Sequence, residues 1–251
     1  MNKFPLITAH TGCMGHPDDH SFESLQAALT LGVDIYEDDI RSTRDHVPVL
    51  AHDDNITLAD GSCGSLAEMT LKELNTARLS PIPTLQDVLE QIRAAGKVMN
   101  LDIKTDSALE PVSALVNRMG MAEMVFLSGC DYGSAVKASR YAPSIRRLLN
   151  VNKQSFGSLS YDEAVFQACA DAREAGCFGI NVPYQVVQPE LMEAVQRSGL
   201  AIYVWTVSEA DDMRRLAQLG VDSITTRDPA KLIAVREETD FAKENRDWTI
   251  S

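Results

Sequence analysis

Residues 22–40, FESLQAALTLGVDIYEDDI, contain the pattern that decides the fold. Phe22–Leu31 is typical of an amphipathic helix, Gly32 follows as a candidate C-cap, and Val33–Ile40 is typical of a buried strand. Helix, glycine and strand in this order form the repeating unit of a sheet whose parallel strands are covered by helices. Further copies of this unit would therefore predict a parallel α/β protein.

The unit recurs along the whole chain. The predicted strands are Leu6–His10, Val33–Ile40, Val98–Lys104, Met124–Ser128, Ile145–Val151, Phe178–Val182, Ala201–Val207 and Asp222–Thr226. The predicted helices include Phe22–Leu31, Thr84–Ala95, Ala108–Met119, Tyr161–Ala175, Pro189–Ser198 and Glu209–Leu219. Eight units in 251 residues favour a TIM (β/α)₈ barrel over an open doubly wound sheet, and no G-x-G-x-x-G follows any predicted strand. We expect residues 1–251 to form a single domain.

Residues 47–83 interrupt the repeat between its second and third units. They contain a short strand-like run, Pro48–His52, followed by polar turns and a brief helical pattern. Insertions beside the C-terminal ends of barrel strands commonly shape substrate binding, so we expect this one to do so. At the other end of the chain, Glu237–Ser251 is charged and aperiodic, which predicts a last helical turn and a tail.

The composition of the chain indicates its cellular compartment and the class of molecule that it binds. A formal net charge of −13 leaves no basic surface for nucleic acid or an anionic membrane, so a small-molecule substrate is expected. Five scattered cysteines without a C-x-x-C pair favour a reducing compartment. The N-terminal residues do not resemble a signal peptide, and no apolar run is long enough to span a bilayer. We expect a cytoplasmic protein, and either a monomer or a homo-oligomer.

Three acids fall on matching strand positions. Glu37 and Asp39 lie two residues apart and so share one face of a strand, whereas Asp38 faces the other way. Asp102 and Lys104 repeat this spacing at the end of the next main strand. A solvated strand end and an internal salt bridge are the alternatives. Taken together, the three carboxylates predict a site for one divalent ion, magnesium or calcium with manganese as a further option, and Lys104 is then a candidate phosphate ligand.

Two histidines and a tryptophan complete the candidate site. His10 and His52 each close a strand-like run, where an imidazole can transfer protons near neutral pH. A zinc site made of His10, His16 and His20 is disfavoured, because no helix or hairpin holds the last two. Trp205 is either a core residue or the apolar wall of a substrate pocket.

In several motifs between His10 and Pro229, the chain resembles the glycerophosphodiester phosphodiesterase family. The matching segments are His10-Thr11-Gly12 for the family's His-Arg-Gly, Gly32–Asp39 for Gly-Ala-Asp-x-x-Glu-x-Asp, Ile82–Leu85 for Ile-Pro-Thr-Leu, Asn100–Lys104 for Asn-(Ile/Leu)-Glu-Ile-Lys, Trp205–Ser208 for Trp-Thr-Val-Asn and Gly220–Thr226 for Gly-Val-Asp-Gly-Ile-x-Thr. His52-Asp53 follows at the family spacing, and Asp18–Ser21 occupies the place of Pro-Glu-Asn-Thr.

The resemblance implies a TIM barrel of the PLC-like phosphodiesterase type. It also implies a divalent metal held by Glu37, Asp39 and Asp102, and His10 and His52 as the acid and base. The implied reaction is hydrolysis of a phosphodiester to a phosphomonoester and an alcohol, with a place in lipid metabolism. Attack by water and attack by a neighbouring substrate hydroxyl, which would give a cyclic phosphate, both stay open.

The departures from the family pattern bear on the substrate. Thr11 replaces an arginine that could clamp phosphate, Asp102 shortens a glutamate, and His20 replaces an asparagine. They indicate a diester other than simple glycerophosphocholine, with Thr11, Lys104 and Trp205 as candidate substrate-binding residues. The alternatives are a sugar phosphodiester of the agrocinopine type, a sphingomyelinase D-like reaction, a metal-dependent aldolase or isomerase, and a barrel that binds without catalysis.

Overall fold

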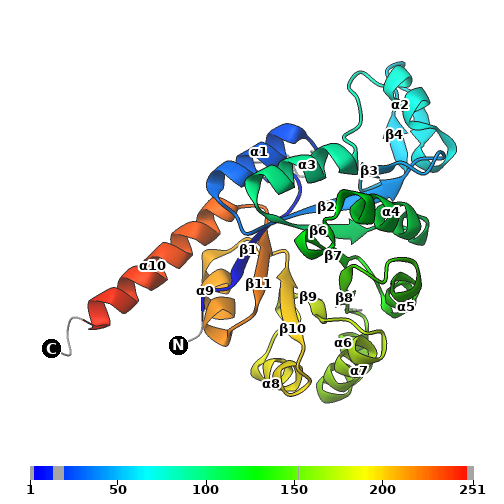
Figure 1. Cartoon of the computed structure of the whole chain (residues 1–251). Helices are drawn as coiled ribbons and strands as arrows, with labels where there is room; N and C mark the ends of the chain where they lie inside the picture. The colour runs from blue at the N-terminus through cyan, green and yellow to red at the C-terminus, as the bar shows by residue number, and fades with distance from the viewer. Residues whose placement is uncertain (1–2, 14–19, 152, 248–251) are drawn as a thin grey trace.

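Eight parallel strands close into a barrel in the computed structural model, which describes residues 3–13, 20–151 and 153–247, with side chains up to residue 238 (Figure 1). The barrel closes because β1 pairs with both β11 and β2. Its strands are β1 (Leu6–Ala9), β2 (Ile35–Ser42), β6 (Val98–Ile103), β7 (Val125–Ser128), β8 (Arg146–Asn150), β9 (Gly179–Pro183), β10 (Ala201–Trp205) and β11 (Ser223–Thr226). The predicted fold class and all eight strand positions are confirmed.

A helix follows each barrel strand and packs on the outside of the barrel. These helices are α1 (Phe22–Leu31), α3 (Leu85–Ala95), α4 (Leu109–Met119), α5 (Tyr132–Tyr141), α7 (Tyr161–Glu174), α8 (Pro189–Arg197), α9 (Ala210–Leu219) and α10 (Pro229–Asp247), and a short α6 (Ser155–Ser158) precedes α7. The expectation of a single turn and a tail after residue 236 was wrong, because the last helix continues to Asp247. Among the described residues, no helix is both long and apolar enough to cross a lipid bilayer.

The interior of the barrel is apolar at one end and polar at the other. Ile35 on β2 is buried at the apolar end with Phe126, Leu148 and Tyr203. Because side chains alternate along a strand, Glu37 and Asp39 lie on the same side of β2 as Ile35, and Tyr36 and Ile40 pack outward against the helices. The strand register therefore carries the acids from the apolar layer toward the C-terminal rim.

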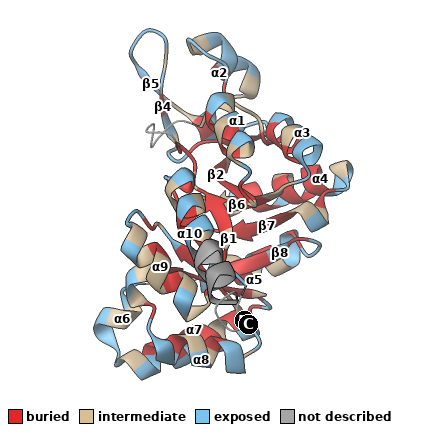
Figure 2. Cartoon of the chain, turned by 90° about the vertical axis from the view of Figure 1, so that its left-hand side faces the viewer, coloured by how far each residue is buried: buried red, intermediate tan, exposed pale blue. Residues whose placement is uncertain are grey.

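The insertion begins where β2 runs past the end of the barrel. There β3 (Pro48–Leu50) pairs antiparallel with β2 and brings the chain back toward the rim. The hairpin of β4 (Asn55–Thr57) and β5 (Cys63–Ser65) and the helix α2 (Leu71–Ala77) follow, and they stand off from the barrel with mostly exposed outer faces (Figures 1 and 2). The insertion has a separate hydrophobic cluster: Val49, Ala51, Ile56, Leu66, Leu74 and Ile82.

Candidate active site

A polar pocket of about 550 Å³ opens at the C-terminal rim of the barrel. Its lining comes from the ends of several strands, the place where TIM barrels carry their active sites. The lining residues are His10, His20, Glu37, Asp39, His52, Asn100, Asp102, Ile103, Lys104, Gly129, Asn150, Asn181, Trp205, Thr206, Thr225 and Arg227. Seven of the eight predicted site residues are among them, and Thr11 is not.

The three predicted carboxylates meet in this pocket. The register of β2 and β6 places Asp39 opposite Asp102, with Glu37 one step below, and one oxygen from each acid lies within 4.8 Å of the others. Burial raises the pKa of Glu37 well above its usual range, and the neighbouring Asp102 and Asp39 raise it further. Burial likewise raises the pKa of Asp102, opposed by Lys104. Three acids this close favour a cation between them.

The internal salt bridge between Asp102 and Lys104, one of the alternatives expected from the sequence, is present beside the acids, and a further observation supports a fit to a cation. Lys104 Nζ lies 2.7 Å from Asp39 Oδ1 and 3.2 Å from Asp102 Oδ1, and these carboxylates raise the pKa of the lysine. Even so, Asp102 Oδ1 and Asn100 Oδ1 are buried without a hydrogen-bond donor in suitable geometry. A buried oxygen without a partner, such as Asn100 Oδ1, is costly, and a hard cation with several oxygen ligands would satisfy it and share Asp102 Oδ1 with Lys104. The donor set therefore suits a divalent ion, and it does not select among magnesium, calcium and manganese.

Gly129, directly after β7, allows this crowding. Its φ is +73°, and a Cβ added there would lie 2.2 Å from Asp102 Oδ1 and 2.6 Å from the Ile103 carbonyl oxygen. Its backbone N–H donates to Asn150 Oδ1 at 3.0 Å. A side chain at this position would displace Asp102 from the acid cluster.

Gly129→Ala is therefore expected to destabilise the protein and to weaken its metal affinity. Gly32→Ala is the matched control, since Gly32 also has a left-handed φ of +79° but nothing within 4 Å of an added Cβ. Each variant should lose about 1–2 kcal/mol from the backbone conformation alone, and Gly129→Ala should lose more because of the clash. Urea denaturation and metal titration of both variants measure the difference. Equal stability and equal metal affinity would show that Asp102 is not held this closely.

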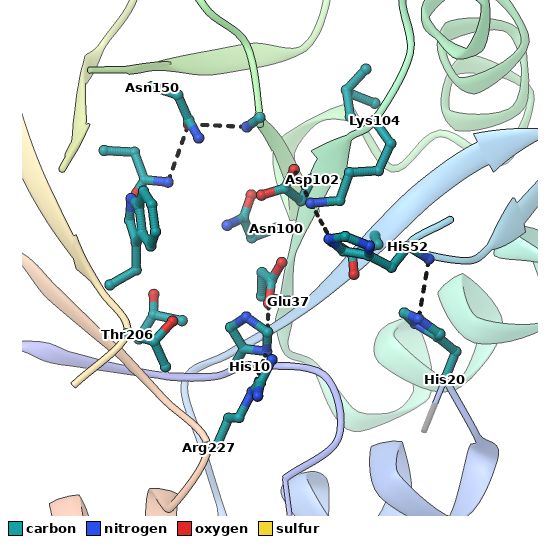
Figure 3. Close-up of a pocket in the computed structure, with 16 residues that line it drawn as sticks. His10, His20, Glu37, His52, Asn100, Asp102, Lys104, Asn150, Thr206 and Arg227 are labelled. Carbon is teal, nitrogen blue, oxygen red and sulfur yellow. Dashed lines mark hydrogen bonds and ion pairs between the residues drawn. The ribbon is translucent and has the colours of Figure 1, made fainter. Parts of the chain in front are cut away.

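His10 follows β1 and points into the pocket beside Glu37 (Figure 3). Its Nδ1 lies 3.0 Å from the Thr11 carbonyl oxygen, 3.4 Å from Arg227 Nε and 3.8 Å from Glu37 Oε2. The shortest contact assigns the proton to Nδ1, which leaves Nε2 as the proton acceptor. Burial lowers the pKa of His10, and the charge of Arg227 lowers it further, while the Thr11 contact opposes both. The net effect favours the neutral imidazole.

His52 reaches the pocket by a different route from the predicted one. The strand before it, β3, is antiparallel, so His52 does not close a barrel strand; β3 returns the chain to the level of Asp39, whose carbonyl accepts from the Ala51 N–H. The side chain is 61% exposed, and its Nδ1 lies 2.9 Å from Asp53 Oδ1. An Nδ1–H donated to Asp53 leaves Nε2 to exchange a proton with substrate.

His20 supports this arrangement and is a pocket residue that the sequence did not predict. Its Nδ1 lies 2.5 Å from Asp38 Oδ1, and its Nε2 accepts the backbone N–H of His52 at 3.2 Å. Asp38 is fully buried on the outer face of β2 and also accepts from the Tyr36 hydroxyl at 2.9 Å. Asp38 and His20 thus connect β2 to the loop that carries His52. His16, the third residue of the disfavoured zinc site, lies outside the described residues, as do Asp18 and Asp19.

Of the two residues Thr11 and Trp205, both predicted to bind substrate, only Trp205 lines the pocket. Thr11 is buried, with its hydroxyl 3.3 Å from His20 Nδ1, so its side chain does not face the pocket, contrary to the expectation that it binds substrate. Trp205 is 36% exposed and lines the pocket, so the interpretation as a pocket wall is favoured over the core interpretation.

The wall opposite His10 carries amides that sequence analysis missed. Asn150 on β8 and Asn181 on β9 are register partners, and Asn150 Oδ1 accepts from Asn181 Nδ2 at 3.2 Å as well as from Gly129 (Figure 3). Because the oxygen of Asn150 is occupied, its amino group is left to donate into the pocket. Each asparagine could have been predicted as a pocket residue, because it is a single polar residue at an inward position near the end of an apolar strand.

Comparisons with known proteins identify the family. A family model described as the glycerophosphoryl diester phosphodiesterase family matches residues 10–231. A glycerophosphodiester phosphodiesterase of Caldanaerobacter subterraneus is 25% identical over 91% of this chain and 96% of its own.

Solved structures show the same fold. The glycerophosphodiester phosphodiesterase of Agrobacterium tumefaciens superposes with a TM-score of 0.74 at 22% identity, covering 92% of this chain and 99% of its own. A phosphodiesterase of Oleispira antarctica, solved with the product sn-glycerol-3-phosphate, superposes with a TM-score of 0.76 at 21% identity, covering 93% and 97% of the two chains.

Proposed function

Because the chain belongs to the glycerophosphoryl diester phosphodiesterase family, and is by that membership a phosphoric diester hydrolase, we propose that its pocket hydrolyses a glycerophosphodiester-like substrate. The products are a phosphomonoester and an alcohol. The observation that carries the proposal is the meeting of three carboxylates, two buried and one partly buried, with two imidazoles in one pocket at the C-terminal rim of the barrel. An aldolase or isomerase would not need the second imidazole.

Glu37, Asp39 and Asp102 would hold a divalent ion, which when bound withdraws charge from the phosphoryl oxygens. Lys104 lies at the same level with its ammonium group toward the acids, where it adds positive charge beside the phosphate. Trp205 and the amides of Asn150 and Asn181 form the opposite wall and would orient the alcohol groups.

The two imidazoles divide the proton chemistry. The lowered pKa of His10 favours the neutral imidazole, whose Nε2 accepts the proton of the attacking hydroxyl, whether that belongs to water or to the substrate. His52, oriented by Asp53, donates a proton from Nε2 to the leaving alkoxide. The exposed position of His52 at the rim is compatible with alcohols of different size, since the leaving group can extend toward solvent.

A sugar phosphodiester is the second candidate substrate. Hydroxyl groups suit the amino group of Asn150, and an indole face such as that of Trp205 suits the apolar face of a sugar ring. The glycerol and sugar candidates share the same phosphate chemistry, so one assay can separate them.

The test is a panel of glycerophosphodiesters and sugar phosphodiesters, followed by ³¹P NMR in the presence of magnesium, calcium or manganese. We expect one class to yield a phosphomonoester and an alcohol. A cyclic phosphate that accumulates early would identify attack by a substrate hydroxyl. Tight binding without any new phosphorus signal would contradict the proposal and favour a binding barrel.

A further inference from the structure

Arg227 follows β11 at the edge of the pocket, outside the set of residues predicted from the sequence. The parallel register pairs Ala9 with Thr226, so the next residues along, His10 and Arg227, emerge at the same level on adjacent strands. Arg227 Nε lies 3.4 Å from His10 Nδ1, and Figure 3 shows the two side chains together beneath Glu37. The guanidinium group therefore lies beside the proposed proton acceptor.

From this position we propose that Arg227 binds the phosphate group of the substrate and of the product. The inference rests on the proposed function for its substrate, although phosphate binding itself can be measured without turnover. Arginine presents five donors in a planar fork that matches phosphate oxygens, and it stays charged at any pH at which the protein is folded.

The charge balance of the pocket supports this role. Among the described residues that line it, the lysine and arginine side chains are Lys104 and Arg227. The ammonium group of Lys104 is already engaged by Asp39 and Asp102. No carboxylate in the described part of the chain forms an ion pair with Arg227, and the neighbouring Asp228 pairs with Lys231. Of these two cations, Arg227 is thus the one without a carboxylate partner among the described residues.

The contact with His10 does not satisfy the guanidinium group. His10 Nδ1 makes its shorter contact with the Thr11 carbonyl, which places the proton on that nitrogen. An Nε–H that faces another donor gains nothing from the approach, and no carboxylate among the described residues pairs with Arg227, so its donors are available to a phosphate oxygen.

Thr11 cannot supply the missing charge. It is 1% exposed, faces His20 and carries no charge. The pocket has three acids and the protein a net charge of −13, so an anionic diester meets repulsion unless a cation faces it. Arg227 offers such a cation on the β1 and β11 side, across the pocket from the amide wall.

Calorimetric titration with inorganic phosphate tests the proposal directly, in magnesium buffer and without metal. We expect Arg227→Gln to weaken phosphate binding by roughly 10- to 100-fold, since a hydrogen bond to a charged group is lost. Arg227→Lys should fall between this variant and wild type, because it keeps the charge and loses the fork. Arg146→Gln is the matched control, since Arg146 lies at the other end of the barrel over the Phe178 ring and should bind phosphate as wild type.

Several outcomes would overturn the role of Arg227. These are a wild-type protein that binds no phosphate at millimolar concentration, an Arg227→Gln variant with unchanged affinity, and equal losses in Arg227→Gln and Arg146→Gln. If Arg227→Gln shifts the pH profile of turnover but leaves the phosphate affinity unchanged, the role of Arg227 is to act on the His10 imidazole and not to bind phosphate. Thermal melts establish that each variant is folded. Because the readout is binding, a failure of every diester to turn over would contradict the proposed function and leave this measurement valid.

Discussion

His10→Ala is expected to lower kcat by a factor of about 10² to 10⁴, the usual effect of losing a positioned proton-transfer group. Burial and the charge of Arg227 lower the pKa of the imidazole, which favours its neutral form, and Nε2 is left to accept a proton. The loss should appear with every substrate, because the attacking hydroxyl must be deprotonated whatever group leaves. Steady-state kinetics on the diester that the panel identifies measures it.

His46→Asn is the control for removing a histidine. His46 lies outside the pocket and has a φ of +61°, a conformation that asparagine tolerates, so this variant should keep wild-type turnover. Wild-type turnover by a folded His10→Ala protein would remove His10 from the mechanism.

His52→Ala separates the acid from the base. With an alkyl alcohol as leaving group, it should also lose about 10² to 10⁴ in kcat. With a nitrophenyl ester the leaving group needs no proton, so His52→Ala should recover most of its activity while His10→Ala should not. The reverse pattern would exchange the roles of the two histidines. Because the His52 side chain is mostly exposed, the variant should melt near the wild-type temperature.

Asp39→Asn is expected to lower kcat by a factor comparable to that of the histidine variants, because it weakens metal binding. It replaces one charged ligand of three by a neutral one of the same shape, which should cost more than the 10- to 100-fold in affinity typical of outer-shell changes. Titration with Mn²⁺ measures the loss, and turnover should fall with it. Asp53→Asn is the matched control, because Asp53 is 77% exposed and lies outside the acid cluster. Unchanged Mn²⁺ affinity in Asp39→Asn would contradict the assignment of the cluster.

The same cluster makes metal binding depend on pH. Burial and mutual repulsion raise the pKa of Glu37 and of Asp102, so protons remain on the empty site at a pH where free carboxyls are ionised. An incoming cation must displace these protons. Its affinity is therefore weak at low pH and rises as the pH increases through the raised pKa values.

Much of the site could be predicted because strand periodicity is local. Spacings of two in IYEDDI and NLDIK place Glu37, Asp39 and Asp102 on inward positions, and the barrel register then brings them together. His10 was predictable as a polar residue at a strand end.

The remainder depends on contacts between distant segments. His20 meets Asp38 and the His52 backbone only after the loop before α1 folds against β2. The burial of Thr11 depends on the path of the backbone after β1, and the exposure of Arg227 depends on its path after β11. Strand periodicity does not predict side-chain positions beyond the last residue of a strand. The length of α10 was missed for a related reason, because its charged sequence shows no apolar stripe.

The central claim is that this pocket is a metal-assisted phosphodiesterase site. The most direct measurement is ³¹P NMR of the identified diester with protein stripped of metal by a chelator, before and after one divalent ion is restored. We predict no release of phosphomonoester from the stripped protein and full release after reconstitution, with Asp39→Asn inactive throughout. Turnover that continues unchanged after chelation, or that Asp39→Asn retains, would contradict the claim.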